Sequence, residues 1–144
     1  MSDCVVDTSF IALANKTMEE PPTEDVLYQR IDAIRLIVET NQRLRVNPKL
    51  LTEYEPHIKE QRNDVVDQFV ALLDDPNTVK LSSNTLRKAD NAKANTCRWP
   101  THDKHVLAAA IDGDNVTIHV TDNVLGNCAK AVRRIFGFKI NHIA

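Results

Sequence analysis

The chain has 144 residues, of which 42% are hydrophobic and 26% are charged, and its formal net charge is -2. These values are ordinary for a soluble globular protein with a core of its own. The charge excludes a protein that coats nucleic acid non-specifically, although a nucleic-acid enzyme needs only a local basic rim around its site. No apolar run reaches the roughly 18 residues of a membrane helix. Residues 1–7 lack the basic and apolar regions of a secretory signal, so we expect a cytoplasmic protein.

Apolar runs of strand length alternate with segments of helical periodicity along the chain. In the first half of the chain the pattern predicts a strand over 4–6, helices over 9–14 and 23–40, a strand over 44–46, and helices from 47 and over 63–73. It then predicts either a weak strand or an extended linker over 78–81, and a loosely packed helix plus loop over 84–95. In the last part it predicts a helix over 102–112, a strand over 116–120, a helix over 124–136 and a strand over 138–140. Thr23, Asn47 and Asn63 are candidate N-caps, and Gly137 suits a helix C-terminus. The alternation predicts one α/β domain over 1–144 with a mostly parallel sheet.

Two aspartates stand directly after predicted strands. Asp7 follows the strand over 4–6, and Asp122 follows the strand over 116–120. In an open parallel sheet, ligands bind outside the carboxyl ends of the strands. Either aspartate alone is equally well explained as a turn or capping residue, but two of them in one sheet favour an acidic pocket.

The expected acidic pocket would need a cation, because clustered carboxylates repel one another and raise each other's pKa. Ligands that are all oxygen suit a hard ion such as Mg²⁺ or Mn²⁺. Such an ion polarises a phosphodiester and lowers the pKa of a bound water, which then attacks phosphorus. The sequence therefore contains the groups that a metal-dependent phosphodiesterase needs, although spacing alone does not establish the cluster.

Four short motifs resemble, in order, the elements of a PIN domain. They are C-V-V-D-T-S at 4–9, N-P-K-L-L-T-E-Y at 47–54, D-K-H-V-L-A-A-A-I at 103–111 and V-T-D-N at 120–123. The third is the most specific, since it is similar to the D-x-H-V-L-A-A-A helix of the family. The motifs span nearly the whole chain, and the resemblance implies a single three-layer PIN-like domain with a mostly parallel central sheet flanked by helices.

The resemblance implies a metal-dependent nuclease that cleaves RNA and leaves a 5′-phosphate and a 3′-hydroxyl. By position, it makes Asp7, Glu53 and Asp103 the core carboxylates, with Mg²⁺ or Mn²⁺ as cofactor. Ser9 is implied to hold a ligand or a water through its hydroxyl. Many small members are toxins of toxin–antitoxin modules, so an antitoxin or another protein inhibitor is an expected partner. The helix over 23–40 could then form a homodimer or an inhibitor groove.

The last acidic position has two interpretations. The family usually has Thr-x-Asp or Thr-x-Asn, and counting from Thr121 places Asn123 at the motif position. If the position requires a carboxylate, Asp122 is the metal ligand instead, together with Asp7 and Asp103. If Asp122 does not substitute, the site has one charge fewer and holds metal more weakly.

Ordinary structural roles compete with the catalytic ones. Glu53 could be a solvated helix residue, and Asp103 could stabilise a helix N-terminus as well as bind metal. His102 and His105 flank Asp103. No other His or Cys stands at the spacing that a zinc site requires, so the sequence does not indicate zinc. His105 is either a structural histidine or a group that contacts phosphate or acts as an acid. The odd number of cysteines, without a CxxC motif, indicates free thiols.

A basic stretch precedes the predicted helix over 102–112 and enters it. It contains Arg87, Lys88, Lys93, Arg98, Trp99 and Lys104. The cations could bind a phosphate backbone while the aromatic ring stacks on a base. The competing interpretation is a solvated helix with one buried tryptophan. Arg98, Lys104 and His105 are the candidate substrate-binding residues. The cations of the last helix, Lys130, Arg133 and Arg134, are expected to favour its C-terminal dipole.

The leading hypothesis is an Mg²⁺- or Mn²⁺-dependent endoribonuclease built on Asp7, Glu53, Asp103 and Asp122, with Ser9, Thr121 and Asn123 in support. The resemblance also admits a catalytically weak or inactive module that binds RNA or a protein. A DNA-directed nuclease of a defence system would use the same site. No membrane partner is expected.

Overall fold

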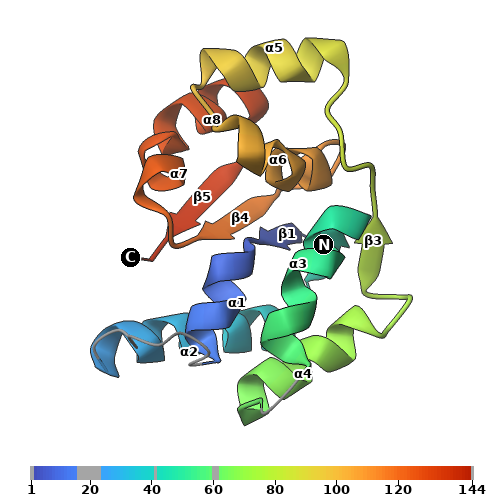
Figure 1. Cartoon of the computed structure of the whole chain (residues 1–144), viewed down its shortest axis with the longest axis vertical. Coiled ribbons are helices and arrows are strands. Elements are labelled where there is room, and N and C mark those ends of the chain that lie inside the picture. The colour runs from blue at the N-terminus through green and yellow to red at the C-terminus, as the bar shows by residue number, and fades with distance from the viewer. Residues whose placement is uncertain (1, 16–23, 41, 60–61, 144) are drawn as a thin grey trace.

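The computed structural model describes residues 2–15, 24–40, 42–59 and 62–143 (Figure 1). Its sheet has five strands, all parallel, in the order β3-β2-β1-β4-β5. The strands are β1 (Asp3–Val6), β2 (Arg43–Val46), β3 (Val79–Leu81), β4 (Thr117–Val120) and β5 (Lys139–His142). Each strand lies within two residues of an expected one, and the segment over 78–81, expected as either a strand or a linker, forms β3. The predicted α/β class with a parallel central sheet is confirmed.

Helices cover both faces of the sheet (Figure 1). The described residues form the α-helices α1 (Thr8–Ala14), α2 (Glu24–Glu39), α3 (Pro48–Ile58), α4 (Asp64–Leu73), α5 (Lys88–Thr96), α6 (Lys104–Ala110), α7 (Asn123–Asn127) and α8 (Ala129–Phe136), and a 3-10 turn η1 (Thr101–Asp103). Helices α1 to α4 pack together on one face, while α5, α6 and α8 pack on the other. The three layers match the architecture that the PIN resemblance implies.

Local capping explains where several helices begin and end. The Asn47 side chain accepts a hydrogen bond from the Leu50 amide at the start of α3, and the Asn63 side chain accepts one from the Val66 amide at the start of α4. Gly137 ends α8 in the left-handed conformation at φ 80°, which costs a glycine nothing. The predicted N-cap Thr23 lies outside the described residues.

Two predicted helices are interrupted. The segment expected as one helix over 124–136 is divided into α7 and α8 at Cys128, whose amide bonds to the Leu125 carbonyl, three residues back. The helix expected over 102–112 begins as η1 and becomes α-helical only at Lys104. The prediction of single helices was wrong in both places, because the apolar periodicity continues through a tightened turn that it does not register.

The core lies on both sides of the central strands. Val5, Ile118 and Val120 are fully buried, as expected for parallel strands covered on both faces. The three cysteines are free and buried, and burial raises the pKa of the Cys4 thiol to about 12. Among the described residues, no helix has both the length and the apolar character to cross a membrane.

Candidate active site

The sheet order creates a switch point between β1 and β4. The chain runs outward from β1 to β2 and β3 on one side, then crosses back to β4 and β5 on the other. Ligand sites of open α/β sheets lie outside the carboxyl ends of the strands at such a point. Asp7 directly follows β1, its amide donates to the His119 carbonyl on β4, and Asp122 follows β4 by two residues. Both aspartates therefore lie at the switch point.

A pocket of about 310 Å³ opens at this place. Its lining residues are Asp7, Thr8, Ser9, Glu53, His102, Asp103, Thr121 and Asp122. All four predicted carboxylates belong to it, although they come from four segments separated by up to 115 residues of sequence numbering, from Asp7 to Asp122. Thr8 was not anticipated, because a hydroxyl residue at the start of a helix has no distinguishing signal in the sequence.

Asp7 is the most enclosed carboxylate of the pocket, with 8% of its surface exposed. The Ser9 hydroxyl donates to Asp7 Oδ2 at 2.8 Å, and the Thr121 hydroxyl donates to Ser9 Oγ at 2.7 Å. Burial raises the pKa of Asp7, and the nearby charges of Asp103 and Glu53 add to the rise, while the bond from Ser9 opposes it. The two predicted supporting hydroxyls therefore form a chain that orients this carboxylate.

Glu53 reaches the pocket from α3. Its Oε1 lies 2.5 Å from Nε2 of His105, which is buried in α6. The hydroxyl of neighbouring Tyr54 donates to the Val6 carbonyl and ties α3 to the end of β1. Glu53 thus contacts His105 on a helix that Tyr54 anchors to β1, and it is not a freely solvated helix residue. The sequence does not distinguish Tyr54 from any other buried tyrosine of the core.

Asp103 stands at the junction of η1 and α6. Burial raises the pKa of its carboxyl, and the charges of His102 and His105 oppose the rise. His102 Nε2 lies 3.1 Å from Asp103 Oδ2, and the buried indole of Trp99 donates to the Asp103 carbonyl at 2.7 Å. Trp99 therefore supports the backbone of the site, and its burial favours the interpretation of one buried tryptophan over that of a ring that stacks a base.

Asp122 and Asn123, the two candidates for the fourth acidic position, lie in different places relative to the pocket. Asp122 lines the pocket and caps α7, accepting from the amides of Val124 at 2.7 Å and Leu125 at 3.2 Å. Asn123 is the first residue of α7, is exposed, and is not among the lining residues. Of the two interpretations, the geometry favours Asp122.

The candidate substrate-binding residues are distributed differently from the carboxylates. Arg98 is exposed and adopts a left-handed backbone conformation with φ 60°. The Lys104 ammonium donates to the side-chain carbonyls of Asn91 at 2.7 Å and Asn95 at 2.8 Å. The ring of His105 faces Glu53 inside the protein. Of these three side chains, only that of Arg98 is exposed to solvent.

The donor set of the pocket fits a hard divalent ion in its chemistry. The lining provides carboxylate and hydroxyl oxygens. Burial raises the pKa values of Asp7 and Asp103, neighbouring carboxylates add to the rise, and a cation would favour the charged forms of both groups. Within the ranges that the structure describes, no three His, Cys, Asp or Glu side chains are near enough to hold an ion together as they stand. Glu53 and Asp103 instead contact His105 and His102.

Comparison with known proteins adds no relative. No protein-family model, no curated protein and no solved structure matches this chain. The resemblance to PIN domains therefore rests on the four motifs and on the arrangement of the residues they contain.

Proposed function

We propose that the protein is an Mg²⁺- or Mn²⁺-dependent endoribonuclease of the PIN type. One observation carries the proposal: Asp7, Glu53, Asp103 and Asp122 come from separate segments and line one pocket at the switch point of a parallel sheet. Such a gathering of acidic side chains in a half-buried pocket supports a functional site, since each carboxylate raises the cost of charging the others.

Each group of the pocket has a distinct task in this proposal. Asp7, Asp103 and Asp122 would hold the ion, and the Ser9–Thr121 hydroxyl pair keeps Asp7 oriented. The ion would supply positive charge that polarises the phosphodiester and lowers the pKa of the attacking water. Glu53, oriented by His105, accepts the proton of that water.

The reaction is a hydrolysis. Water oxygen forms a bond to phosphorus, the bond from phosphorus to the 3′ oxygen breaks, and the products are a 5′-phosphate and a 3′-hydroxyl. His102 is exposed, lines the pocket beside Asp103 and is placed to return a proton to the leaving oxygen. No redox partner or second substrate is required.

The test is cleavage of end-labelled single-stranded RNA by the purified chain. We expect cleavage with Mg²⁺ or Mn²⁺, none with EDTA, and 5′-phosphate termini on the downstream products. A single-stranded DNA of the same sequence, in competition, separates a ribonuclease from a DNA-directed nuclease. Metal-independent cleavage, or 2′,3′-cyclic phosphate ends, would contradict the proposal, because both indicate chemistry without water attack at a metal site.

A second candidate is a non-catalytic module that binds RNA or a protein. The observation in its favour is that no three His, Cys, Asp or Glu side chains of the described residues lie close enough to hold an ion together as they stand. Calorimetric titration with Mn²⁺ discriminates between the two candidates. Absence of metal binding together with intact RNA affinity favours the module, whereas Mn²⁺ binding that disappears in Asp7→Asn favours the enzyme.

The resemblance also motivates a biological role as a toxin. In that case a protein inhibitor would cover the acidic pocket, and its gene would neighbour that of this chain. Growth arrest on expression, relieved by co-expression of the neighbouring gene, would support this role; arrest by Asp7→Asn as well would oppose it.

A further inference from the structure

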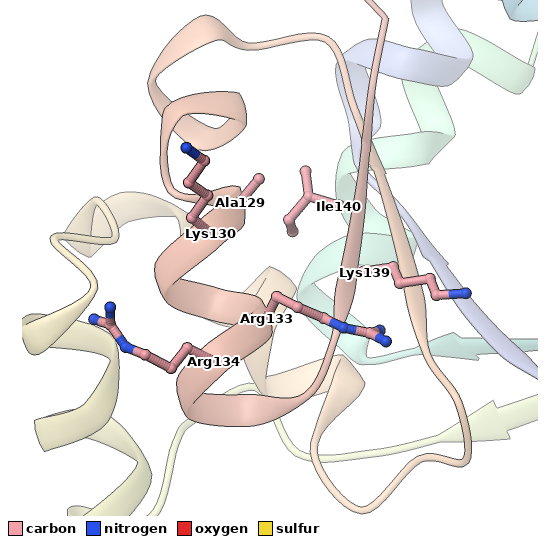
Figure 2. A pocket seen from close by; sticks show the side chains of 6 residues that line it. All are labelled: Ala129, Lys130, Arg133, Arg134, Lys139 and Ile140. Atoms are coloured by element: carbon pink, nitrogen blue, oxygen red, sulfur yellow. The ribbon is translucent and has the colours of Figure 1, made fainter.

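A second pocket, of about 660 Å³, lies between α8 and the edge strand β5 (Figure 2). Its lining residues are Ala129, Lys130, Arg133, Arg134, Lys139 and Ile140. Ile140 points toward α8 in the middle of the pocket, and the Arg133 side chain extends from α8 toward β5. The pocket thus has an apolar floor, formed by Ala129 and Ile140, and a cationic rim. Its volume is in the range of pockets that hold small ligands, about 300–1,000 Å³.

The cations of the rim are free of carboxylates. Over the described ranges, none of the four lies in an ion pair, whereas Arg35, Arg43, Arg45, Arg62 and Arg87 each pair with an aspartate. The formal net charge of the chain is -2, so this group is a local excess of positive charge on an acidic protein. Unpaired cations around a hollow favour an anionic ligand.

Ordinary structural explanations account for only part of the rim. Arg133 and Arg134 lie in the last turn of α8, where cations favour the helix dipole. Lys139 lies on an edge strand, where lysine protects against strand pairing between molecules. Lys130 is the second residue of α8, at the positive end of the dipole, where a cation is unfavourable. The position of Lys130 is therefore not explained by helix stability, whereas an anionic ligand in the pocket would explain it.

The pocket is joined to the acidic site by a short stretch of chain. Asp122 caps the start of α7, and α7 leads through Cys128 to Ala129 on the pocket floor. In register, Ile140 pairs with Ile118 on β4, two residues before the end of that strand. At about 3.3 Å per strand residue, the stretch from Ile118 to Asp122 spans on the order of 10–15 Å, which is the approximate distance along the strands from Ile140 to Asp122. A few nucleotides of an extended strand would cover this distance.

We propose that the α8–β5 pocket binds one nucleotide of single-stranded RNA, a few nucleotides away from the cleavage site. Lys130 and Arg133 contact the phosphates on either side, and the base or ribose lies against Ala129 and Ile140. This inference rests on RNA as the substrate of the proposed function. A recessed apolar floor fits an unstacked base, which single strands offer and duplexes do not. An acidic peptide would use the same cations but is favoured by no further feature of the pocket.

The test uses the full chain carrying Asp7→Asn, in EDTA, with fluorescence anisotropy of a labelled single-stranded RNA. Adding Lys130→Glu and Arg133→Glu should weaken binding about tenfold or more and lower the slope of log affinity against log salt by about 1.4, which is two phosphate contacts on a single strand. The matched control is Lys59→Glu with Lys80→Glu, two exposed lysines elsewhere on the surface, Lys80 on the opposite edge strand. It should leave the affinity within about twofold.

A pocket-filling variant separates the floor from the charges. Ala129→Leu keeps every cation and should weaken single-strand binding several-fold with an unchanged salt slope. Circular dichroism of each variant verifies folding. Unchanged affinity of the charge variant, an equal loss in the control, or tighter binding of poly-glutamate than of RNA would overturn the inference. Its failure is distinguishable from that of the nuclease proposal, because RNA binding is measured without cleavage, and cleavage by the wild type is measured independently of the pocket variants.

Discussion

Asp3 and Asp7 stand at opposite ends of strand β1, and only Asp3 is paired with cations. Asp3 accepts from Arg43 Nε at 2.7 Å, lies 3.4 Å from Arg45 Nη1, and caps the Asp114 amide at 3.0 Å. Asp7 accepts from the Ser9 hydroxyl, and no ion pair joins it to a cation of the described residues. One end of the strand is therefore organised for stability, and the other carries a charge that the fold does not neutralise.

The two aspartates should respond oppositely to neutralisation. Asp7→Asn should raise the free energy of unfolding of the metal-free protein by about 1 kcal/mol, roughly 3 °C in Tm, because it removes a buried charge. Asp3→Asn should lower it by about 3 kcal/mol, because it removes the negative charge that faces Arg43 and the buried Arg45 guanidinium, which then keeps only its bonds to backbone carbonyls. Thermal unfolding in EDTA at pH 7 measures both.

The sign of the Asp7 effect fixes its pH dependence. A raised folded-state pKa means that the folded protein takes up a proton before the unfolded chain does. The destabilisation is present above the raised pKa and is lost as pH falls through it. The advantage of Asp7→Asn over wild type should therefore shrink in acid, and an advantage that grew in acid would refute this assignment.

Metal should stabilise the folded chain. At about 100 times its dissociation constant, Mn²⁺ should add about 2.7 kcal/mol to the free energy of unfolding. Because the pKa values of Asp7 and Asp103 are raised, protons should compete with the ion at higher pH than for ordinary carboxylates. Tm measured with and without Mn²⁺ along a pH series checks this. A shift that persists in Asp103→Asn would place the ion elsewhere.

Glu53 and Glu55 provide a matched pair on helix α3. Glu53→Gln should reduce cleavage about 100-fold or more, because it removes a proton acceptor that His105 orients. Glu55 is exposed outside the acidic pocket, so Glu55→Gln should cleave at the wild-type rate. Single-turnover cleavage rates make the comparison, and equal rates for the two variants would remove Glu53 from the catalytic set.

The hydroxyl chain from Thr121 through Ser9 to Asp7 can be tested one bond at a time. Thr121→Val keeps the shape but loses the donor, and should slow cleavage about tenfold by loosening Ser9. Ser9→Ala should cost at least as much, because it removes the bond to Asp7 itself. Thr121→Ser retains the hydroxyl and should restore most of the rate. A rate that Thr121→Ser fails to restore would indicate packing instead of orientation.

The sequence predicted the strands and the strand-tip aspartates better than the contacts between helices. Asp7 and Asp122 follow apolar runs, and parallel topology then places both at one edge of the sheet. The pairing of Glu53 with His105 and the support of Asp103 by Trp99 join distant or ordinary-looking residues. Such contacts depend on tertiary packing, which local periodicity does not encode.

The motifs placed Glu53 and Asp103 in the site where residue patterns alone could not. Each stands on a helix among other polar residues, where a solvated role is the common one. The lining of the α8–β5 pocket could be predicted from the sequence only in part. Lys130 and Arg133 are three apart on one helix, which the sequence displays, but Ile140 joins them only because β5 lies beside α8.

The most direct measurement is the Mn²⁺-dependent cleavage rate of single-stranded RNA by wild type, Asp7→Asn, Asp103→Asn and Glu55→Gln, each verified as folded. A metal site built on the pocket carboxylates predicts cleavage by wild type and Glu55→Gln, and a loss of about 100-fold or more in both aspartate variants. Equal cleavage by all four proteins, or no cleavage by the wild type with either metal, would contradict it.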